Sequence, residues 1–197
     1  MTSDGTRAQA SNLPKAAIET MAESMASLYG YKPARELPQV VENFGGKLAV
    51  RDYMNDPATG SIFIEGEGDF TIYIPLHTSV AEDRFTVAHE LGHYVVHYLW
   101  PHRTNEPFTG PVYADRYGID RAEHEANWFA SAFLMPNASV RDVWQASGSV
   151  SQVAAVFRVT PSAAYDRLVR LELIEPDDTI LTRSMPEPVA SSADEGD

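Results

Sequence analysis

The residues best suited to chemistry in this chain form a His-Glu-x-x-His pattern at residues 89–93. On an α-helix, His89 and His93 lie about 40° apart around the axis and about 6 Å apart along it. Both imidazoles can therefore reach one metal ion. Glu90 lies about 100° round the helix from His89, where it flanks the ion. A carboxylate at that place suits a general base acting on a metal-bound water.

The pattern needs a helix to work, and the flanking residues predict one from about residue 80 to about residue 99. Ser79 and Glu82 read as a capping box before it, and Pro101 is expected to end it. The alternative is a pair of core or surface histidines that hold no metal. A chance His-Glu-x-x-His has a probability of only about 1% in a chain of this composition, so the metal interpretation is favoured.

Apolar residues spaced by three or four give this helix an inward face. They are Phe85, Ala88, Gly92, Val95 and Leu99. A glycine inside a helix costs about 1 kcal/mol relative to alanine, so Gly92 indicates the close approach of another backbone. Ala126 and Ala130, on a later helix, are small enough to permit that approach.

Two histidines do not complete a catalytic zinc site, which usually has three protein ligands and one open position. The longer motif that adds a third histidine on the same helix is absent, because Val96 and Leu99 occupy its last two positions. His97 lies about two turns from His89 and is predicted to be a packing or supporting residue.

A second helix, predicted over residues 121–135, offers a carboxylate as the third ligand. Asp120 can cap its start. Glu123 and Asn127 lie on one stripe, so Glu123 could bind the metal while Asn127 hydrogen-bonds a ligand. Glu125 is the rival, because Glu123 could instead serve only as the capping partner of Asp120. Glu123 is preferred, since Glu125 points away from the stripe of Asn127.

The rest of the chain predicts an α+β fold. Helical spacing or β-branched alternation defines each expected element. Two helices are expected over 14–29 and 35–44, and three strands over 47–53, 61–65 and 70–74. The last two strands would form a hairpin, and the strand ending at Pro75 would be either an exposed edge able to bind an extended peptide or an ordinary covered strand.

A segment rich in Pro, Gly, Thr and Tyr, residues 101–118, is expected to be a loop over the site. His102, Tyr113 and Tyr117 lie in it, and any of them could donate a hydrogen bond to an oxyanion. Surface or packing roles are the preferred interpretation for all three.

Three further helices are predicted over 140–146, 151–157 and 161–173, and together they look like a helix-turn-helix. That pattern gives an alternative function, a DNA-binding transcriptional regulator. Arg158, Arg167 and Arg170 are balanced by acids in residues 149–175, whereas a DNA reader normally shows a basic face. Packing or substrate docking is therefore preferred over DNA contact for this module.

Composition narrows the function classes. The chain has 44% hydrophobic residues, a net charge of −13 and no cysteine, so disulfides and thiolate ligands are excluded and a metal must be held by His and carboxylates. The negative charge disfavours nucleic acid as the main partner. The sequence shows neither a membrane span nor a signal peptide, so a cytoplasmic location is expected.

Two motifs together resemble the ImmA/IrrE family of metallopeptidases. They are Arg84-Phe-Thr-Val-Ala-His-Glu-Leu-Gly-His93 and Glu123-His-Glu-Ala-Asn-Trp-Phe-Ala-Ser-Ala-Phe-Leu-Met-Pro136, and a weaker similarity extends from about residue 15 to about residue 175. The resemblance implies a minimal zincin-like, gluzincin peptidase core, with zinc on two histidines and a glutamate. It also implies substrates that are repressors, typically helix-turn-helix regulators of mobile elements or of a DNA-damage response.

The complete prediction is a zinc endopeptidase, with Mn²⁺ as an alternative to Zn²⁺. Its metal ligands would be His89, His93 and Glu123, its general base Glu90, and its supporting residue Asn127. It would cleave a helix-turn-helix repressor and so derepress mobile-element or stress-response genes. Along the chain we expect a disordered leader (1–12), the metallopeptidase domain (13–136), the helical module packed on it (137–175) and a disordered acidic tail (176–197).

Overall fold

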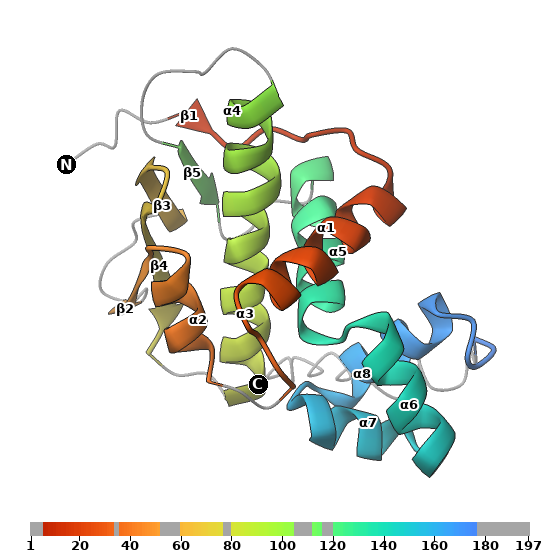
Figure 1. The fold of residues 1–197 in the computed structure, drawn as a ribbon. Coiled ribbons are helices and arrows are strands. Elements are labelled where there is room, and N and C mark those ends of the chain that lie inside the picture. The colour runs from red at the N-terminus through yellow and green to blue at the C-terminus, as the bar shows by residue number, and fades with distance from the viewer. Residues whose placement is uncertain are drawn as a thin grey trace, which may run out of the picture.

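A computed structural model describes residues 6–33, 36–51, 60–76, 80–104, 112–115 and 120–176, which form the α+β structure of Figure 1. Its helices are α1 (Lys15–Leu28), α2 (Leu37–Asn43), α3 (Val80–Gly92), the π-helix η1 (His93–Leu99), α4 (Trp100–Thr104), α5 (Arg121–Leu134), α6 (Asn137–Ser147), α7 (Val150–Phe157) and α8 (Pro161–Arg170). Its strands are β1 (Thr6–Arg7), β2 (Lys47–Arg51), β3 (Gly60–Gly66), β4 (Asp69–Pro75) and β5 (Val112–Asp115). The α+β class predicted from the sequence is therefore confirmed.

The strands form one sheet in the order β1-β5-β3-β4-β2. The predicted hairpin is confirmed, because β3 and β4 pair antiparallel with Ile62 opposite Ile72. β4 also pairs with β2, in parallel. The strand that ends at Pro75 is thus covered on both sides, and the idea that it is an exposed peptide-binding edge is wrong.

The prediction of a three-stranded sheet is also wrong, because β1 and β5 extend the sheet to five strands. β5 lies in the segment expected to be a loop, and β1 lies in the expected disordered leader. The two strands pair in parallel, with Thr6 opposite Val112. Strands of two and four residues are too short to show a period of two in the sequence, so only the pairing reveals them. Residues 1–5 of the expected leader lie outside the described residues.

The continuous helical segment α3–η1–α4 runs through the middle of the molecule, between the sheet and the pair α1 and α5 (Figure 1). It ends at Thr104, beyond Pro101, so the expected stop at this proline is wrong. Pro101 is the second residue of α4, directly after the π-helical stretch, and the helix continues past it. Ser79, the expected N-cap of the segment, lies outside the described residues.

Close contact between α3 and α5 explains Gly92. A Cβ atom built on this glycine would lie 3.0 Å from the Cα of Ala126 and 3.2 Å from the Cβ of Phe129. Ala126 and Phe129 are themselves completely buried. The backbone of α5 therefore occupies the space that a side chain on Gly92 would need, as the sequence predicted.

Replacing Gly92 by Ala is expected to lower the free energy of unfolding by about 1 kcal/mol. Alanine would gain about 1 kcal/mol in helix propensity, but overpacking a core typically costs about 1–3 kcal/mol, and the nearest atoms here belong to a backbone. Urea unfolding measures the difference. Gly66→Ala is the control, since a Cβ at Gly66 would meet no atom within 4 Å. A stabilised Gly92→Ala protein would contradict the close approach.

The three predicted C-terminal helices are present as α6, α7 and α8, although α8 ends at Arg170, earlier than expected. Ser149 and Thr160 cap α7 and α8 with their side chains. Arg167 attaches these helices to the core. It is 1% exposed, and it donates to the carbonyl of Met135 and to the carboxylates of Glu19 and Glu23 on α1 at 3.0–3.1 Å.

Two further expectations from the sequence concern the acidic tail and a membrane span. The acidic tail lies outside the described residues from residue 177 onward. None of the helices in the described ranges has the length and the apolar content needed to cross a membrane.

Candidate metal centre

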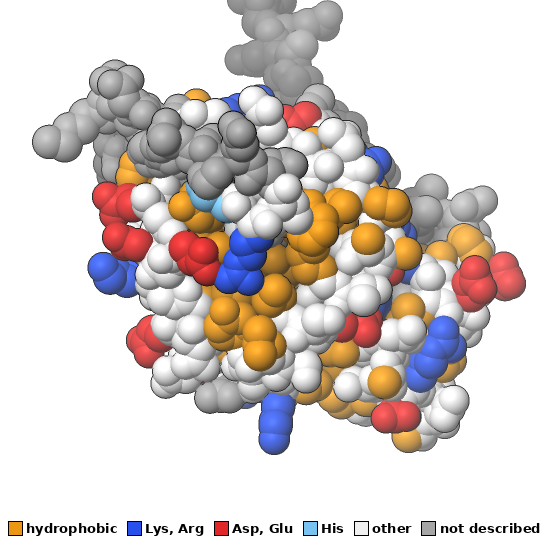
Figure 2. All heavy atoms as spheres, turned by 45° about the horizontal axis from the view of Figure 1, so that its top comes forward, with side chains coloured by type: hydrophobic (Ala, Val, Ile, Leu, Met, Phe, Trp, Pro, Cys, Tyr) orange, Lys and Arg blue, Asp and Glu red, His pale blue; other side chains and the backbone are white. Residues whose placement is uncertain are grey.

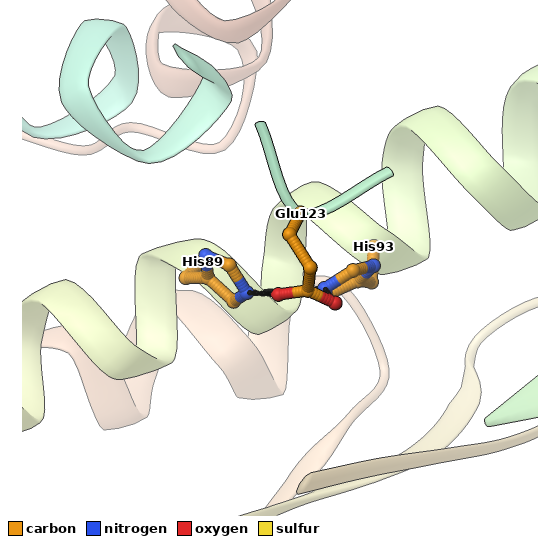
Figure 3. A group of neighbouring side chains, drawn as sticks. All are labelled: His89, His93 and Glu123. Carbon is orange, nitrogen blue, oxygen red and sulfur yellow. Dashed lines mark hydrogen bonds and ion pairs between the residues drawn. The ribbon is translucent and has the colours of Figure 1, made fainter. Parts of the chain in front are cut away.

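Three ligand-type side chains meet between the middle of the long helical segment and the start of α5 (Figure 3). His89 belongs to α3, and His93 is the first residue of η1. Glu123 lies in the first turn of α5, which is held by the side chain of Asp120 through bonds to the backbone N–H groups of Ala122 and Glu123. The carboxylate of Glu123 points between the two imidazole rings.

The distances within this cluster suit a four-coordinate metal. His89 Nε2 lies 3.1 Å from His93 Nε2 and 3.1 Å from Glu123 Oε2, and His93 Nε2 lies 3.4 Å from Glu123 Oε1. Ligand atoms about 2.1 Å from a tetrahedral zinc ion are about 3.4 Å apart. Two nitrogens and one carboxylate oxygen are also a common donor set of catalytic zinc. The residues present therefore fit the ion that the sequence predicts.

Burial and mutual contact determine the charges in the cluster. Burial lowers the pKa of His93 to about 3, so this imidazole is neutral near pH 7. Burial would raise the pKa of Glu123, but hydrogen bonds from His89 and His93 outweigh it and lower this pKa to about 2. Burial would likewise lower the pKa of His89, yet its hydrogen bond to Glu123 and the charges of Glu90 and Glu123 raise that pKa. Protonation is therefore favoured at His89, whereas Glu123 is ionised.

Metal affinity is expected to rise with pH and to level off above the raised pKa of His89. His93 is neutral and Glu123 is ionised at any pH well above 3, so only His89 carries a proton that the metal must displace. Below the His89 pKa, each pH unit should weaken the apparent affinity about tenfold, because binding releases one proton. Competition with a chromophoric chelator across a pH series measures this slope. An affinity without pH dependence would contradict the assignment.

Asn127 and Glu90 both lie near His89. The side-chain oxygen of Asn127 is 3.0 Å from His89 Nδ1, on the far side of the ring from the cluster. This contact holds a proton on Nδ1 and leaves the lone pair of Nε2 for a metal. Glu90 is 3% exposed, and its charge contributes to the raised pKa of His89. The sequence predicted Asn127 as a residue that hydrogen-bonds a ligand and Glu90 as the general base.

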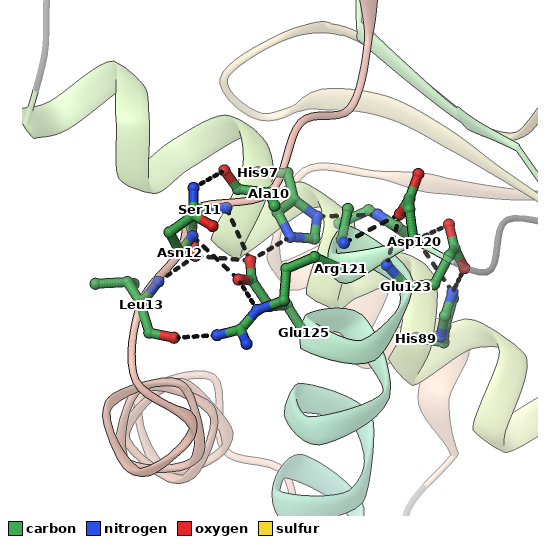
Figure 4. Close-up of polar contacts among 12 residues, drawn as sticks. Ala10, Ser11, Asn12, Leu13, His89, His97, Asp120, Arg121, Glu123 and Glu125 are labelled. Carbon is green, nitrogen blue, oxygen red and sulfur yellow. Dashed lines mark hydrogen bonds and ion pairs between the residues drawn. The ribbon is translucent and has the colours of Figure 1, made fainter.

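Glu125, the rival ligand, lies apart from the cluster. Its carboxylate accepts hydrogen bonds from Ser11, Asn12, Arg121 and His97 (Figure 4). His97 in turn lies 3.0 Å from His93, between Nδ1 atoms, which matches the supporting role expected for it. Nothing in the sequence pattern indicated that Ser11 and Asn12 would reach this site, because they precede Glu125 by 114 and 113 positions.

The sequence also offered His102, Tyr113 and Tyr117 as possible hydrogen-bond donors to an oxyanion. His102 lies in α4, where its Nδ1 is 2.9 Å from the carbonyl oxygen of Tyr98 and its ring packs on the Tyr98 ring. Tyr113 lies in β5 and is partly buried. Tyr117 lies outside the described residues.

A comparison with protein-family models decides the relationship of this chain. The model described as IrrE N-terminal-like domain, of the peptidase M78 family, matches residues 42–169, about two-thirds of the chain. The chain belongs to the peptidase M78 family. The match covers both motifs that carry the resemblance to ImmA/IrrE proteins, and it confirms that resemblance. The peptidase M78 match begins after α1, so residues 6–33 lie outside it.

The fold of this peptidase M78 chain is similar to part of a larger protein of known structure. A solved structure described as a Mycobacterium tuberculosis transcriptional regulator is similar over 78% of this chain, with a TM-score of 0.52 and 17% sequence identity. The match covers 46% of that protein, so this chain spans less than half its length. At this identity the similarity shows a shared fold. No curated protein matches the chain.

Proposed function

We propose that this chain is a zinc-dependent endopeptidase. The observation that carries the proposal is the triangle of His89, His93 and Glu123, whose donor atoms lie 3.1–3.4 Å apart within a peptidase M78 chain. Two neutral imidazole nitrogens and a carboxylate match the requirements of zinc, and Mn²⁺ is the alternative ion. The core would then be a minimal zincin-like peptidase, with α3 and η1 as its motif helix and α5 as its third-ligand helix.

In this proposal each residue of the cluster has a separate task. Zinc, when bound, would supply a Lewis acid that acidifies water and polarises the scissile carbonyl. His89 and His93 present lone pairs, and Glu123 supplies the negative charge. Glu90 directly follows His89 and would accept the proton of the attacking water and return it to the leaving amine. Asn127 keeps His89 in the tautomer whose Nε2 faces the cluster.

The substrate we propose is a helix-turn-helix transcriptional repressor, whose cleavage would release mobile-element or stress-response genes in the cytoplasm. The family resemblance supports this choice. A cleft of about 490 Å³ between α3, α5 and α8 offers a place for a polypeptide segment. Asn127 lies on its wall, and so do Phe85, Trp128 and Asp166. Asn127 also contacts His89, so this residue links the wall of the cleft to the metal cluster.

Incubation of the zinc-loaded chain with the repressor encoded beside its gene tests the proposal. We expect cleavage at a defined peptide bond, located by mass spectrometry. Treatment with a chelator should abolish cleavage, and added zinc should restore it. Cleavage that survives complete metal removal, or an intact repressor after long incubation with the loaded chain, would refute the proposed activity.

DNA binding by the C-terminal helices is the second candidate, supported by the helix-turn-helix-like sequence over α6–α8. Three of the four arginines in residues 137–175 are already engaged, and one of them, Arg141, donates to the carbonyl of Leu171 at 3.1 Å. Arg158 pairs with Glu36 at 2.9 Å, and Arg167 is buried against Glu19 and Glu23. On the face turned forward in Figure 2, the described basic and acidic side chains are interspersed. These contacts favour the packing and docking role.

A mobility-shift titration at two salt concentrations separates the two functions. Operator binding by this module should fall steeply with salt and should survive replacement of Glu90. A peptidase without DNA binding gives no shifted band at either concentration.

A further inference from the structure

The two imidazoles of the cluster differ in what holds their second ring nitrogen. His89 Nδ1 faces the amide oxygen of Asn127, which can only accept a hydrogen bond. His93 Nδ1 faces His97 Nδ1 at 3.0 Å, and a neutral imidazole nitrogen either donates or accepts. Whether His93 presents a lone pair or an N–H to the cluster therefore depends on where His97 carries its proton.

The surroundings of Glu125 determine which ring nitrogen of His97 carries the proton. The carboxylate is completely buried and lies 3.1 Å from His97 Nε2. It accepts the backbone N–H groups of Ser11 and Asn12, the Ser11 hydroxyl and the Arg121 guanidinium at 2.7–3.0 Å (Figure 4). An ionised carboxylate has no proton to donate, so His97 must donate from Nε2. A lone pair at that nitrogen would face the carboxylate oxygen without a proton between them.

We propose that Glu125 is a positioning residue of the metal centre and acts through His97. By holding the proton of His97 on Nε2, it makes His97 Nδ1 an acceptor for the Nδ1–H of His93. His93 is then left with its Nε2 lone pair directed at the cluster, as a metal ligand requires. The inference rests on the proposed function only in requiring that a metal binds at this cluster.

The N-terminal segment is part of the same device. Among the described residues, Ser11 and Asn12 supply three of the five donors to Glu125, and they lie outside residues 42–169, which the peptidase M78 model matches. The Ser11 oxygen also accepts the N–H of Leu13 at 3.2 Å, which directs its own hydrogen toward Glu125. The hydrogen bonds that support His93 through His97 and Glu125 therefore depend on two residues, Ser11 and Asn12, that precede the part of the chain matched by the family model.

The first test reads the tautomer directly. Long-range ¹H–¹⁵N spectra of the ¹⁵N-labelled, zinc-loaded chain distinguish a protonated from an unprotonated ring nitrogen. We expect His97 to carry its proton on Nε2 only, and His93 to carry its proton on Nδ1. A proton on His97 Nδ1 would overturn the proposal. The measurement needs no substitution, so it does not depend on the stability of a variant.

The second test uses two replacements of His97. An amide side chain has a donor and an acceptor at nearly the spacing of the imidazole nitrogens, so His97→Gln can preserve the direction of both hydrogen bonds, whereas His97→Leu preserves neither. Zinc affinity, measured by chelator competition, should fall about 10–100-fold in His97→Leu, the usual cost of losing such a partner. His97→Gln should recover most of that loss. Equal losses in both variants would reduce His97 to packing.

The control is a destabilised variant far from the site. Val153→Ala removes completely buried apolar volume from α7 and should leave the zinc affinity of the folded protein unchanged. Failure of the wild-type chain to bind zinc would refute the proposed peptidase. Zinc binding that is unaffected in folded His97→Leu would refute only the role of Glu125 and His97.

Discussion

Replacement of Glu90 by Gln is expected to lower the rate of repressor cleavage by about 10²–10⁴-fold, the usual contribution of a general base. Glutamine has nearly the size of glutamate, so the buried position remains filled, but its amide cannot accept the proton of the attacking water. None of the three cluster distances involves Glu90, so zinc affinity should stay within a few-fold of wild type.

The measurement must distinguish a slower cleavage step from a loss of bound zinc. Zinc content is measured on the same samples that are used for single-turnover cleavage of the repressor. Glu65→Gln is the matched control, because Glu65 is an exposed carboxylate on β3 that does not belong to the cluster, and its replacement should leave the rate unchanged. A Glu90→Gln chain that retains more than about a tenth of the wild-type rate with full zinc would remove Glu90 from the mechanism.

Replacement of Glu123 by Ala is expected to weaken zinc binding by more than about 100-fold, beyond the usual cost of losing a supporting residue. The carboxylate is the only anionic member of the cluster, and it is 8% exposed. Its removal leaves two imidazoles on one helical segment, which is one protein ligand short of a catalytic zinc site. Cleavage should disappear with the metal.

Equilibrium dialysis or chelator competition gives the affinity directly. His124→Ala is the control, because His124 is an exposed potential ligand beside Glu123 on the same helix and lies outside the cluster. Its replacement should leave zinc binding unchanged. If Glu123→Ala binds zinc like wild type, the third ligand lies elsewhere in the chain.

Much of the cluster could be predicted because helix geometry is local. The spacing of His89 and His93 fixes their relative positions, and the Asp120 cap fixes the start of α5. Glu123 and Glu125 lie about 200° apart on an ideal helix, so only one of them could share a face with Asn127. The structure places Glu123 against His89 and His93, and Glu125 against His97 and the backbone of Ser11.

What the sequence could not reveal depends on contacts between distant parts of the chain. β1 is a strand because it pairs with β5, and β5 also pairs with β3; neither strand is long enough to show alternation. The role of Glu125 is likewise defined by Ser11 and Asn12, which short-range patterns do not connect to α5. The close approach of another backbone at Gly92 could be predicted, because a glycine inside a helix indicates it. The π-helical turn that begins at His93 had no such signal in the sequence.

The bonds of Ser11 and Asn12 to Glu125 also set the order in which the molecule can assemble. This segment leaves the ribosome before its partner, because Glu125 is synthesised 114 residues after Ser11. Closing so long a loop is entropically costly, and contacts of such separation slow folding. We therefore expect His97 to reach its final orientation late, after α5 has docked. A nascent or partly refolded chain should then bind zinc weakly until Ser11 and Asn12 have formed their hydrogen bonds to Glu125.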